Sequence, residues 1–166
     1  MKRKYLILFS LSGLILTCDQ LTKHLVHSHF TAETNISVLP PFVSLILTRN
    51  TGFAFGLLKT APASLRDIFF IAVPVFALIL IVLIFIKLQD NQMLTSVALA
   101  SILGGAIGNL IDRLQYGYVI DFIDFHWREL FHLPPFNVAD CSIILGVGIM
   151  FINTLFLRKE SEIPST

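Results

Sequence analysis

Charged residues are scarce in this chain of 166 residues. Lysine, arginine, aspartate and glutamate make up 14% of the sequence and hydrophobic residues 55%, whereas a soluble domain carries about 25% charged residues. A mean hydropathy of +0.78 places the chain in the membrane class. The net charge is +1 and the sequence has no basic cluster beyond Lys2, Arg3 and Lys4, so no nucleic-acid partner is expected.

The motifs of the common metal-dependent and serine hydrolases are also missing. The sequence contains no HExxH, no GxSxG and no CxxC. The histidines considered as metal ligands are His27, His29, His126 and His132. They lack the spacing of metal ligands, and neither a metal nor another cofactor is expected. We interpret the two cysteines, Cys18 and Cys141, as small buried hydrophobic residues.

Four apolar segments have the length of membrane-spanning helices, about 20 residues each. They cover residues 5–26, 68–86, 93–113 and 139–157. Pro74 lies inside the second segment, where membrane helices tolerate proline. Gly104, Gly105 and Gly108 give the third segment a face of small side chains, against which another helix can pack closely. The sequence therefore predicts one integral-membrane domain over residues 1–166, an all-α bundle of four transmembrane helices.

Lysines and arginines near the ends of the four segments indicate the orientation in the membrane. The cations on one side are Lys2, Arg3, Lys4, Lys87, Arg158 and Lys159. Six others lie on the opposite side, but several of them are close to carboxylates. Lys23, for example, is four residues after Asp19, the spacing of a pair on one helix face. We therefore place both termini in the cytoplasm and the loops 27–65 and 114–138 outside.

The two outer loops differ in character. Residues 42–48 form an apolar, β-branched run after two prolines, and residues 50–56 contain glycines suited to a tight turn. This pattern predicts a small strand pair in the first loop. The second loop, 114–138, is rich in aromatic side chains, which favour the headgroup layer of a membrane. We expect it to lie on the bilayer surface as a loop.

Two aspartates, Asp121 and Asp140, lie at the ends of apolar runs, with Asn109 and Asn137 close to them in polar stretches. An ionisable group at membrane depth is costly and indicates a functional site. Two carboxylates that face each other share one proton, and such a pair can hydrolyse a peptide bond with water as the nucleophile. Arg113 is a further candidate for orienting this pair.

Structural roles are alternatives for the same aspartates. Asp140 also fits the N-cap of the fourth helix. Asp112 is expected to form a local ion pair with Arg113. Asp124 is expected to be a solvated loop carboxylate or the cap of a short helix that contains Trp127.

Two other functions also fit membrane carboxylates. A small transporter or proton relay would use them to pass protons or ions. A non-enzymatic scaffold would use the glycine-lined third helix to bind a partner. A transporter usually holds such groups near the middle of the bilayer, whereas here the polar residues gather at the outer ends of the helices. The sequence pattern therefore favours the hydrolase.

Five stretches of the chain resemble, in order, the signature blocks of the lipoprotein signal peptidases (signal peptidase II). They are DQLTK (19–23), NTGFAFG (50–56), GGAIGNLIDR (104–113), VIDFID (119–124) and FNVAD (136–140). The resemblance implies a bacterial inner-membrane aspartic endopeptidase. Such an enzyme removes signal peptides from diacylglyceryl-modified prolipoproteins just before the lipidated cysteine. We expect a monomer surrounded by membrane lipids, with its active site at the outer leaflet.

The resemblance also implies roles for single residues. The implied site consists of Asp121 and Asp140 as the catalytic pair, Asn50, Gly108, Asn109, Arg113 and Asn137 as substrate-binding or orienting residues, and Asp19 and Lys23 as structural support. It implies a small extracytoplasmic β-cradle and a short interfacial helix beside the four-helix bundle. Two positions depart from the family pattern, because Phe53 replaces the usual alanine and Cys141 a common serine.

Overall fold

The computed structural model describes residues 2–52, 63–127 and 131–161, with side chains for 2–52, 68–127 and 131–155. Its helices are α1 (Arg3–His29), α2 (Ala63–Lys87), α3 (Met93–Tyr116) and α4 (Val138–Ser161). Each of the four apolar segments lies within one of these helices. All four helices contain a stretch that is long and apolar enough to cross a membrane.

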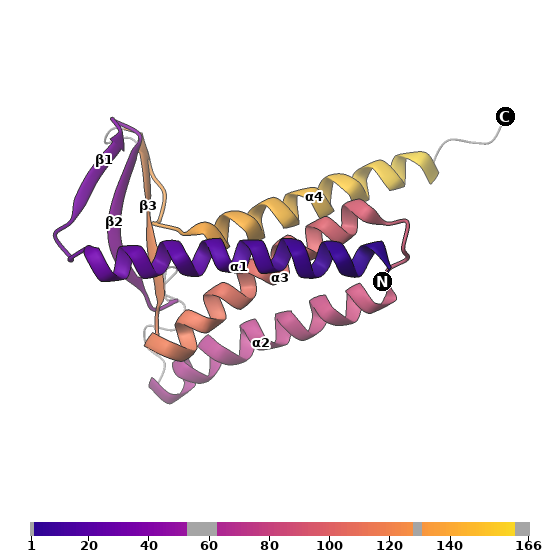
Figure 1. The fold of residues 1–166 in the computed structure, drawn as a ribbon, viewed down its shortest axis with the longest axis horizontal. Coiled ribbons are helices and arrows are strands. Elements are labelled where there is room, and N and C mark those ends of the chain that lie inside the picture. Colours follow the sequence, from indigo (N-terminus) through magenta and orange to yellow (C-terminus); the bar gives the residue numbers. More distant parts are fainter. Residues whose placement is uncertain (1, 53–62, 128–130, 162–166) are drawn as a thin grey trace.

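A small antiparallel sheet stands across one end of the helix bundle (Figure 1). Its strands, in spatial order, are β1 (Asn35–Leu39), β2 (Val43–Asn50), β3 (Val119–Trp127) and β4 (Phe131–His132). β1 and β2 are the strand pair predicted in the first outer loop. The start of α1 and the end of α4 lie at the opposite end of the bundle.

The second outer segment differs from the prediction, because it contributes a strand instead of a surface loop. β3 pairs with β2, with Thr48 opposite Asp121. A run of β-branched and aromatic residues, 119–125, suits a strand once β2 supplies the partner. Trp127 is the last residue of β3 and packs edge-on against Phe42. The short helix expected around Trp127 is therefore wrong.

Helix α3 is the centre of the bundle and packs against the other three helices. A Cβ atom at Gly104 would lie 2.8 Å from the carbonyl oxygen of Ser12 in α1, and one at Gly105 would clash with Ala139 and Ser142 in α4. Glycine at these two positions therefore lets both helices approach α3, as the sequence predicts.

Apolar side chains cover much of the outer surface of the bundle. Large exposed ones include Leu14, Phe76, Ile79, Ile144 and Phe151. An apolar surface of this extent is typical of contact with lipid. Cys18 is exposed on α1 and Cys141 is partly buried, so the prediction that both cysteines are buried is wrong for Cys18.

Candidate active site

Asp121 is held on β3 by two side-chain amides. Asn137 donates from Nδ2 to Oδ1 of Asp121 at 2.7 Å, and Asn50 donates from Nδ2 to Oδ2 at 2.8 Å. Asn50 reaches this carboxylate because it pairs with Val119, two positions from Asp121 on the same face of the sheet. The Asp121 side chain is only 1% exposed. Its orientation is therefore set by two elements that are far apart in the sequence.

Asp140 lies in the first turn of α4 and takes part in the cap of that helix. The Asp140 N–H donates to Oδ1 of Asn137 at 2.9 Å, and the Asn137 N–H donates to Oδ2 of Asp140 at 3.2 Å. This reciprocal pattern is that of a capping box. The N-cap residue is therefore Asn137, which corrects the alternative that Asp140 itself is the N-cap.

Asn109 links Asp140 to a buried lysine. Its Nδ2 donates to Oδ1 of Asp140 at 2.8 Å, and its Oδ1 accepts from Nζ of Lys23 at 2.8 Å. A lysine ammonium only donates hydrogen bonds, so the Asn109 amide oxygen must face Lys23. The amide NH₂ group of Asn109 must then face Asp140.

The same reasoning applies to the two amides around Asp121. Oδ1 of Asn50 accepts from the N–H of Gly52 at 2.8 Å, and Oδ1 of Asn137 accepts from the N–H of Asp140. Both asparagines therefore present their NH₂ groups to Asp121. Together with the contacts of Asp140, each of the four carboxyl oxygens accepts a hydrogen bond from an N–H group. Among the described residues, no lysine or arginine forms an ion pair with either aspartate.

The burial of Asp121 changes its protonation. The pKa of Asp121 is raised from its ordinary value of 3.8 to about 6, mainly by burial and in smaller part by the negative charge of Asp140. Hydrogen bonds from Asn50 and Asn137 act in the opposite direction. Burial is the largest of these effects, since a charged carboxylate is poorly solvated there. Asp121 therefore holds a proton at a higher pH than an exposed aspartate does.

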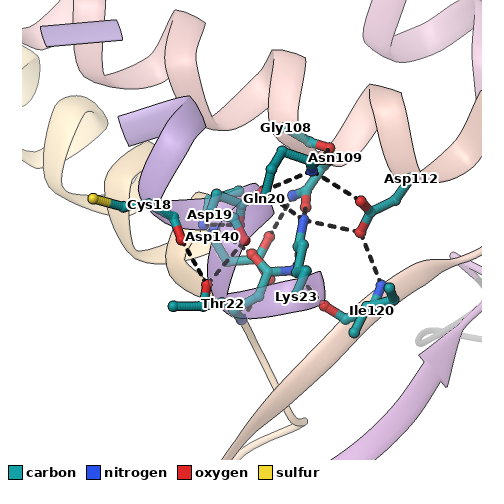
Figure 2. A network of polar contacts seen from close by, with 12 residues as sticks. Cys18, Asp19, Gln20, Thr22, Lys23, Gly108, Asn109, Asp112, Ile120 and Asp140 are labelled. Carbon is teal, nitrogen blue, oxygen red and sulfur yellow. Dashed lines mark hydrogen bonds and ion pairs between the residues drawn. The ribbon is translucent and has the colours of Figure 1, made fainter. Parts of the chain in front are cut away.

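Lys23 is the centre of a network of buried polar contacts close to Asp140 (Figure 2). Its Nζ contacts Oδ2 of Asp19 at 2.8 Å, Oδ2 of Asp112 at 2.9 Å and Oδ1 of Asn109 at 2.8 Å. These three acceptors match the three donors of an ammonium group. Asp112 in turn accepts from the backbone N–H of Ile120 at 3.0 Å, next to Asp121. The network thus ties α1 and α3 to the strand that carries Asp121.

Gly108 lies against the carboxylate of Asp19. A Cβ atom at position 108 would clash with Oδ2 of Asp19. The other oxygen of Asp19 accepts from the backbone N–H of Ala139 at 2.9 Å, at the start of α4. The glycine therefore leaves room for a carboxylate that joins α1 to α4. A substrate contact of Gly108 stays a prediction.

Arg113 lies against helix α2. Its guanidinium carbon lies 4.8 Å from the centre of the Phe70 ring in α2. Asp112, its expected partner, instead contacts Lys23 and accepts from Gln20 at 3.0 Å, so the predicted Asp112–Arg113 pair is wrong. Within the described part of the chain, the buried Nε of Arg113 has no hydrogen-bond partner.

Two of the pockets that open near the sheet are relevant to the site. One of about 270 Å³ is lined by Thr48, Arg49, Asn50, Thr51, Asp121, Pro134 and Pro135. The other, of about 460 Å³, is almost entirely apolar and is lined by Thr22, Leu25, Val26, His29, Phe30, Leu45 and Phe122. A molecule bound in the first pocket could therefore contact Asp121. The second lies where α1 meets the sheet.

The sequence reasoning missed several residues of this region. Gln20 joins the Lys23 network by donating to Asp112 and, at 3.1 Å, to the carbonyl oxygen of Gly108. Asp124 is buried, not solvated, and lies beside His126 and His132. Gln20 is next to Asp19 in the sequence, but the sequence does not show that its side chain reaches Gly108 and Asp112 on another helix. The histidines meet through strand pairing, which their distance in the sequence does not reveal. Phe53 lies outside the described residues.

Comparison with known proteins gives a consistent assignment. A family model described as "Signal peptidase (SPase) II" matches residues 11–156. The lipoprotein signal peptidase of Syntrophus aciditrophicus is 39% identical over 161 residues, covering 96% of this chain and 99% of the relative. That of Geobacter sulfurreducens is 43% identical over 145 residues, covering 87% and 88%.

A solved structure described as a bacterial membrane enzyme matches with a TM-score of 0.82 and 30% identity, covering 95% of this chain and 93% of that one. Together with the four apolar helices, this match supports a multi-pass membrane protein. The alternative of a transporter or proton relay is not supported. The chain belongs to the signal peptidase II family of membrane peptidases.

Proposed function

We propose that this chain is an aspartic endopeptidase that cleaves diacylglyceryl-modified prolipoproteins just before the lipidated cysteine, with Asp121 and Asp140 as the catalytic pair. One observation carries the proposal. Asn137 binds Asp121 through its side-chain amide and Asp140 through its backbone N–H. A single residue therefore holds both carboxyl groups, which come from β3 and α4. The relatives that are similar to this chain are named lipoprotein signal peptidases.

The raised pKa of Asp121 supports a shared-proton mechanism. With a pKa of about 6 for Asp121, about half of the molecules hold the shared proton at pH 6, where an exposed aspartate is almost fully ionised. The ionised carboxylate takes a proton from water, and the oxygen of that water forms a bond to the scissile carbonyl carbon. The protonated carboxyl group gives its proton to the carbonyl oxygen. When the intermediate breaks down, the carboxyl group that took the proton from water gives it to the amide nitrogen of the cysteine, and the C–N bond breaks to release the amine. A hydroxyl proton of the intermediate returns to the other carboxylate, which restores the pair.

The side-chain amides of Asn50, Asn109 and Asn137 help this reaction, because they hold the two carboxyl groups in place before it begins. Three asparagines supply donors, and each is oriented by a second contact of its own. Groups that are held in place before the reaction need no reorganisation during it. Asn50 also borders the pocket beside Asp121, where the peptide backbone of the substrate would lie.

Arg113 is the residue best placed to bind the substrate backbone. Its guanidinium group is held over the Phe70 ring, and its buried Nε has no partner among the described residues. A guanidinium group presents several donors in a fixed plane, which suits a peptide carbonyl group. We assign Arg113 to substrate binding, not to the orientation of the strand that carries Asp121.

The location of the site relative to the bundle supports a position at the outer side of the membrane. The cations Lys2, Lys4 and Lys87 lie at the helix ends far from the sheet. By the positive-inside rule, that end is cytoplasmic. Both termini then lie in the cytoplasm, and the site lies at the outer leaflet of the bacterial inner membrane. The diacylglyceryl chains stay among the lipids around the apolar helices while the scissile bond enters the site.

We propose that the enzyme works as a monomer, because the contacts of the carboxyl pair need no residue from a second chain. The test of the proposed specificity uses purified protein and two precursors with the same peptide sequence, with and without the diacylglyceryl group. Mass spectrometry of the products should show cleavage before the cysteine, in the lipidated precursor only. Equal cleavage of both precursors, or a cut elsewhere, would contradict the proposed substrate.

A further inference from the structure

Three potential metal ligands meet at the hairpin of β3 and β4. His126 on β3 is the direct register partner of His132 on β4. Asp124 precedes His126 by two positions, and side chains two apart on a strand share one face. The three side chains therefore point to the same side of the hairpin. Asp121 is three positions from Asp124 on the same strand, so it faces the other side.

Their spacing fits a metal ion. Nδ1 of His126 is 3.2 Å from Oδ2 of Asp124, and Nδ1 of His132 is 3.3 Å from Oδ1 of Asp124. One ligand atom from each residue lies within 4.8 Å of the others. Ligand atoms at about 2.0–2.1 Å from a tetrahedral zinc ion are separated from one another by about 3.3 Å. Both nitrogen–oxygen distances are close to this value, with each histidine facing a different oxygen of Asp124.

A second observation points to the same site. Nδ1 of His126 is buried and has no hydrogen-bond partner in the described part of the chain, although a carboxylate oxygen lies 3.2 Å away. A buried polar atom without a partner is unfavourable. A cation bound between the imidazole nitrogen and the carboxylate would use the lone pair of that nitrogen.

We propose that Asp124, His126 and His132 bind a zinc ion. Two imidazole nitrogens and one carboxylate oxygen form a ligand set that zinc uses in proteins. The side chain of His132 is 63% exposed, so water has access to the fourth coordination position. The ion lies on the face of β3 opposite to Asp121 and takes no part in peptide hydrolysis.

A zinc ion bound at this site would stabilise residues 133–137, the segment that connects β4 to Asn137 beside the catalytic pair. Beyond β4, the N–H of Leu133 donates to the carbonyl oxygen of Phe125 at 3.0 Å, and the N–H of Phe136 donates to that of Ile123 at 3.0 Å. This segment ends at Asn137. Zinc bound to both strands of the hairpin therefore stabilises the path from β3 to Asn137.

Trp127 provides a direct readout, because it is the only tryptophan and adjoins His126. The experiment uses the full-length protein in detergent without a histidine tag. Cu²⁺, which binds such ligand sets and quenches nearby tryptophan fluorescence, is titrated first, and Zn²⁺ is then added as the competitor. We expect saturable quenching by one Cu²⁺ per chain and its reversal by a large excess of Zn²⁺, because Cu²⁺ binds such ligands more tightly than Zn²⁺ does. Calorimetry with Zn²⁺ alone should give the same stoichiometry.

Variants separate this site from other histidines. His132→Ala and Asp124→Asn should each weaken Zn²⁺ binding at least tenfold, whereas His24→Ala, at an exposed position of α1, should bind like the wild type. Saturating Zn²⁺ should raise the Tm of the wild type but not of His132→Ala. Cleavage of a prolipoprotein by His132→Ala, or an unchanged circular dichroism spectrum, shows that this variant is folded.

Wild-type affinity in both hairpin variants would overturn the proposal, as would an equal loss of binding in His24→Ala. The absence of saturable binding to the wild type would show that the three residues form only a hydrogen-bonded cluster, and would also overturn it. These readouts do not depend on the peptidase reaction. A failure of the zinc site is therefore distinguishable from a failure of the proposed function.

Discussion

The carboxylate of Asp19 in α1 accepts a hydrogen bond at 2.9 Å from the backbone N–H of Ala139, a residue 120 positions later in the chain. A negative charge is favourable at this place, because the first N–H groups of α4 have no partner within the helix. Ala139 immediately precedes Asp140. The position of one proposed catalytic carboxylate is therefore coupled to a buried charge on a different helix.

This relationship makes Gly108 sensitive to substitution. In Gly108→Ala, the new methyl group would clash with Oδ2 of Asp19 and push the carboxylate away from Ala139. We expect a loss of about 1–3 kcal/mol in unfolding free energy and a clear fall in kcat. Thermal unfolding and a cleavage assay measure the two effects. The matched control is Gly13→Ala in α1, where the methyl group has no neighbour within 4 Å. Equal behaviour of the two variants would contradict the packing role.

Lys23 should be essential for stability. Its ammonium group lies between two buried carboxylates, those of Asp19 and Asp112. Lys23→Met keeps most of the side-chain volume but leaves these charges without their cation, and breaking such a buried pair costs about 3–5 kcal/mol. The variant should unfold at a much lower temperature than Lys2→Met, whose lysine is 66% exposed in its ion pair. A similar Tm for both variants would show that the network contributes little.

The pKa of Asp121 predicts how stability depends on pH. Because the pKa is raised from 3.8 to about 6 in the folded protein, protonated Asp121 stabilises the fold. This contribution is fully present below about pH 4 and is lost as the pH rises through about 6. Asparagine does not titrate, so the wild type should lose up to about 3 kcal/mol relative to Asp121→Asn between pH 4 and 7.5.

Denaturant unfolding of both proteins at the two pH values measures this difference. Titrating groups that do not interact with Asp121 contribute equally to the wild type and the variant, so they cancel. A stability difference that does not change with pH would show that Asp121 has an ordinary pKa.

Substitution of Arg113 should lower the peptidase activity more than the stability of the fold. Arg113→Lys keeps the positive charge but loses the planar set of donors over Phe70. We expect kcat/KM to fall by roughly 10–100-fold with little change in Tm. Arg3→Lys, at an exposed position far from the site, is the control. If Arg113→Lys cleaves the precursor at the wild-type rate, charge alone matters at this position.

The sequence predicts the helices well because membrane spans need long apolar runs, and all four segments lie inside helices of the structure. Polar partners on different helices were harder to infer. Asp112 and Arg113 are adjacent in the sequence, but neighbours on a helix point about 100° apart. Asp112 therefore faces Lys23 on α1, while Arg113 faces Phe70 on α2.

The sheet shows a second limit of sequence reasoning. β3 was interpreted as part of a surface loop, since its strand partner β2 precedes it by two helices in the chain. The pairing of His126 with His132 depends on a β4 strand of only two residues. Such a short strand has no periodic pattern that a sequence can show.

The central claim is that Asp121 and Asp140 together hydrolyse the peptide bond, and the most direct measurement is cleavage of a diacylglyceryl-modified prolipoprotein by purified Asp121→Asn and Asp140→Asn. Each variant should lose about 10²–10⁴-fold or more in kcat, because a permanently neutral amide can neither take up nor release the shared proton. Asp90→Asn, at the surface near Lys2, should cleave like the wild type. Turnover at the wild-type rate by either Asp121→Asn or Asp140→Asn would contradict the account.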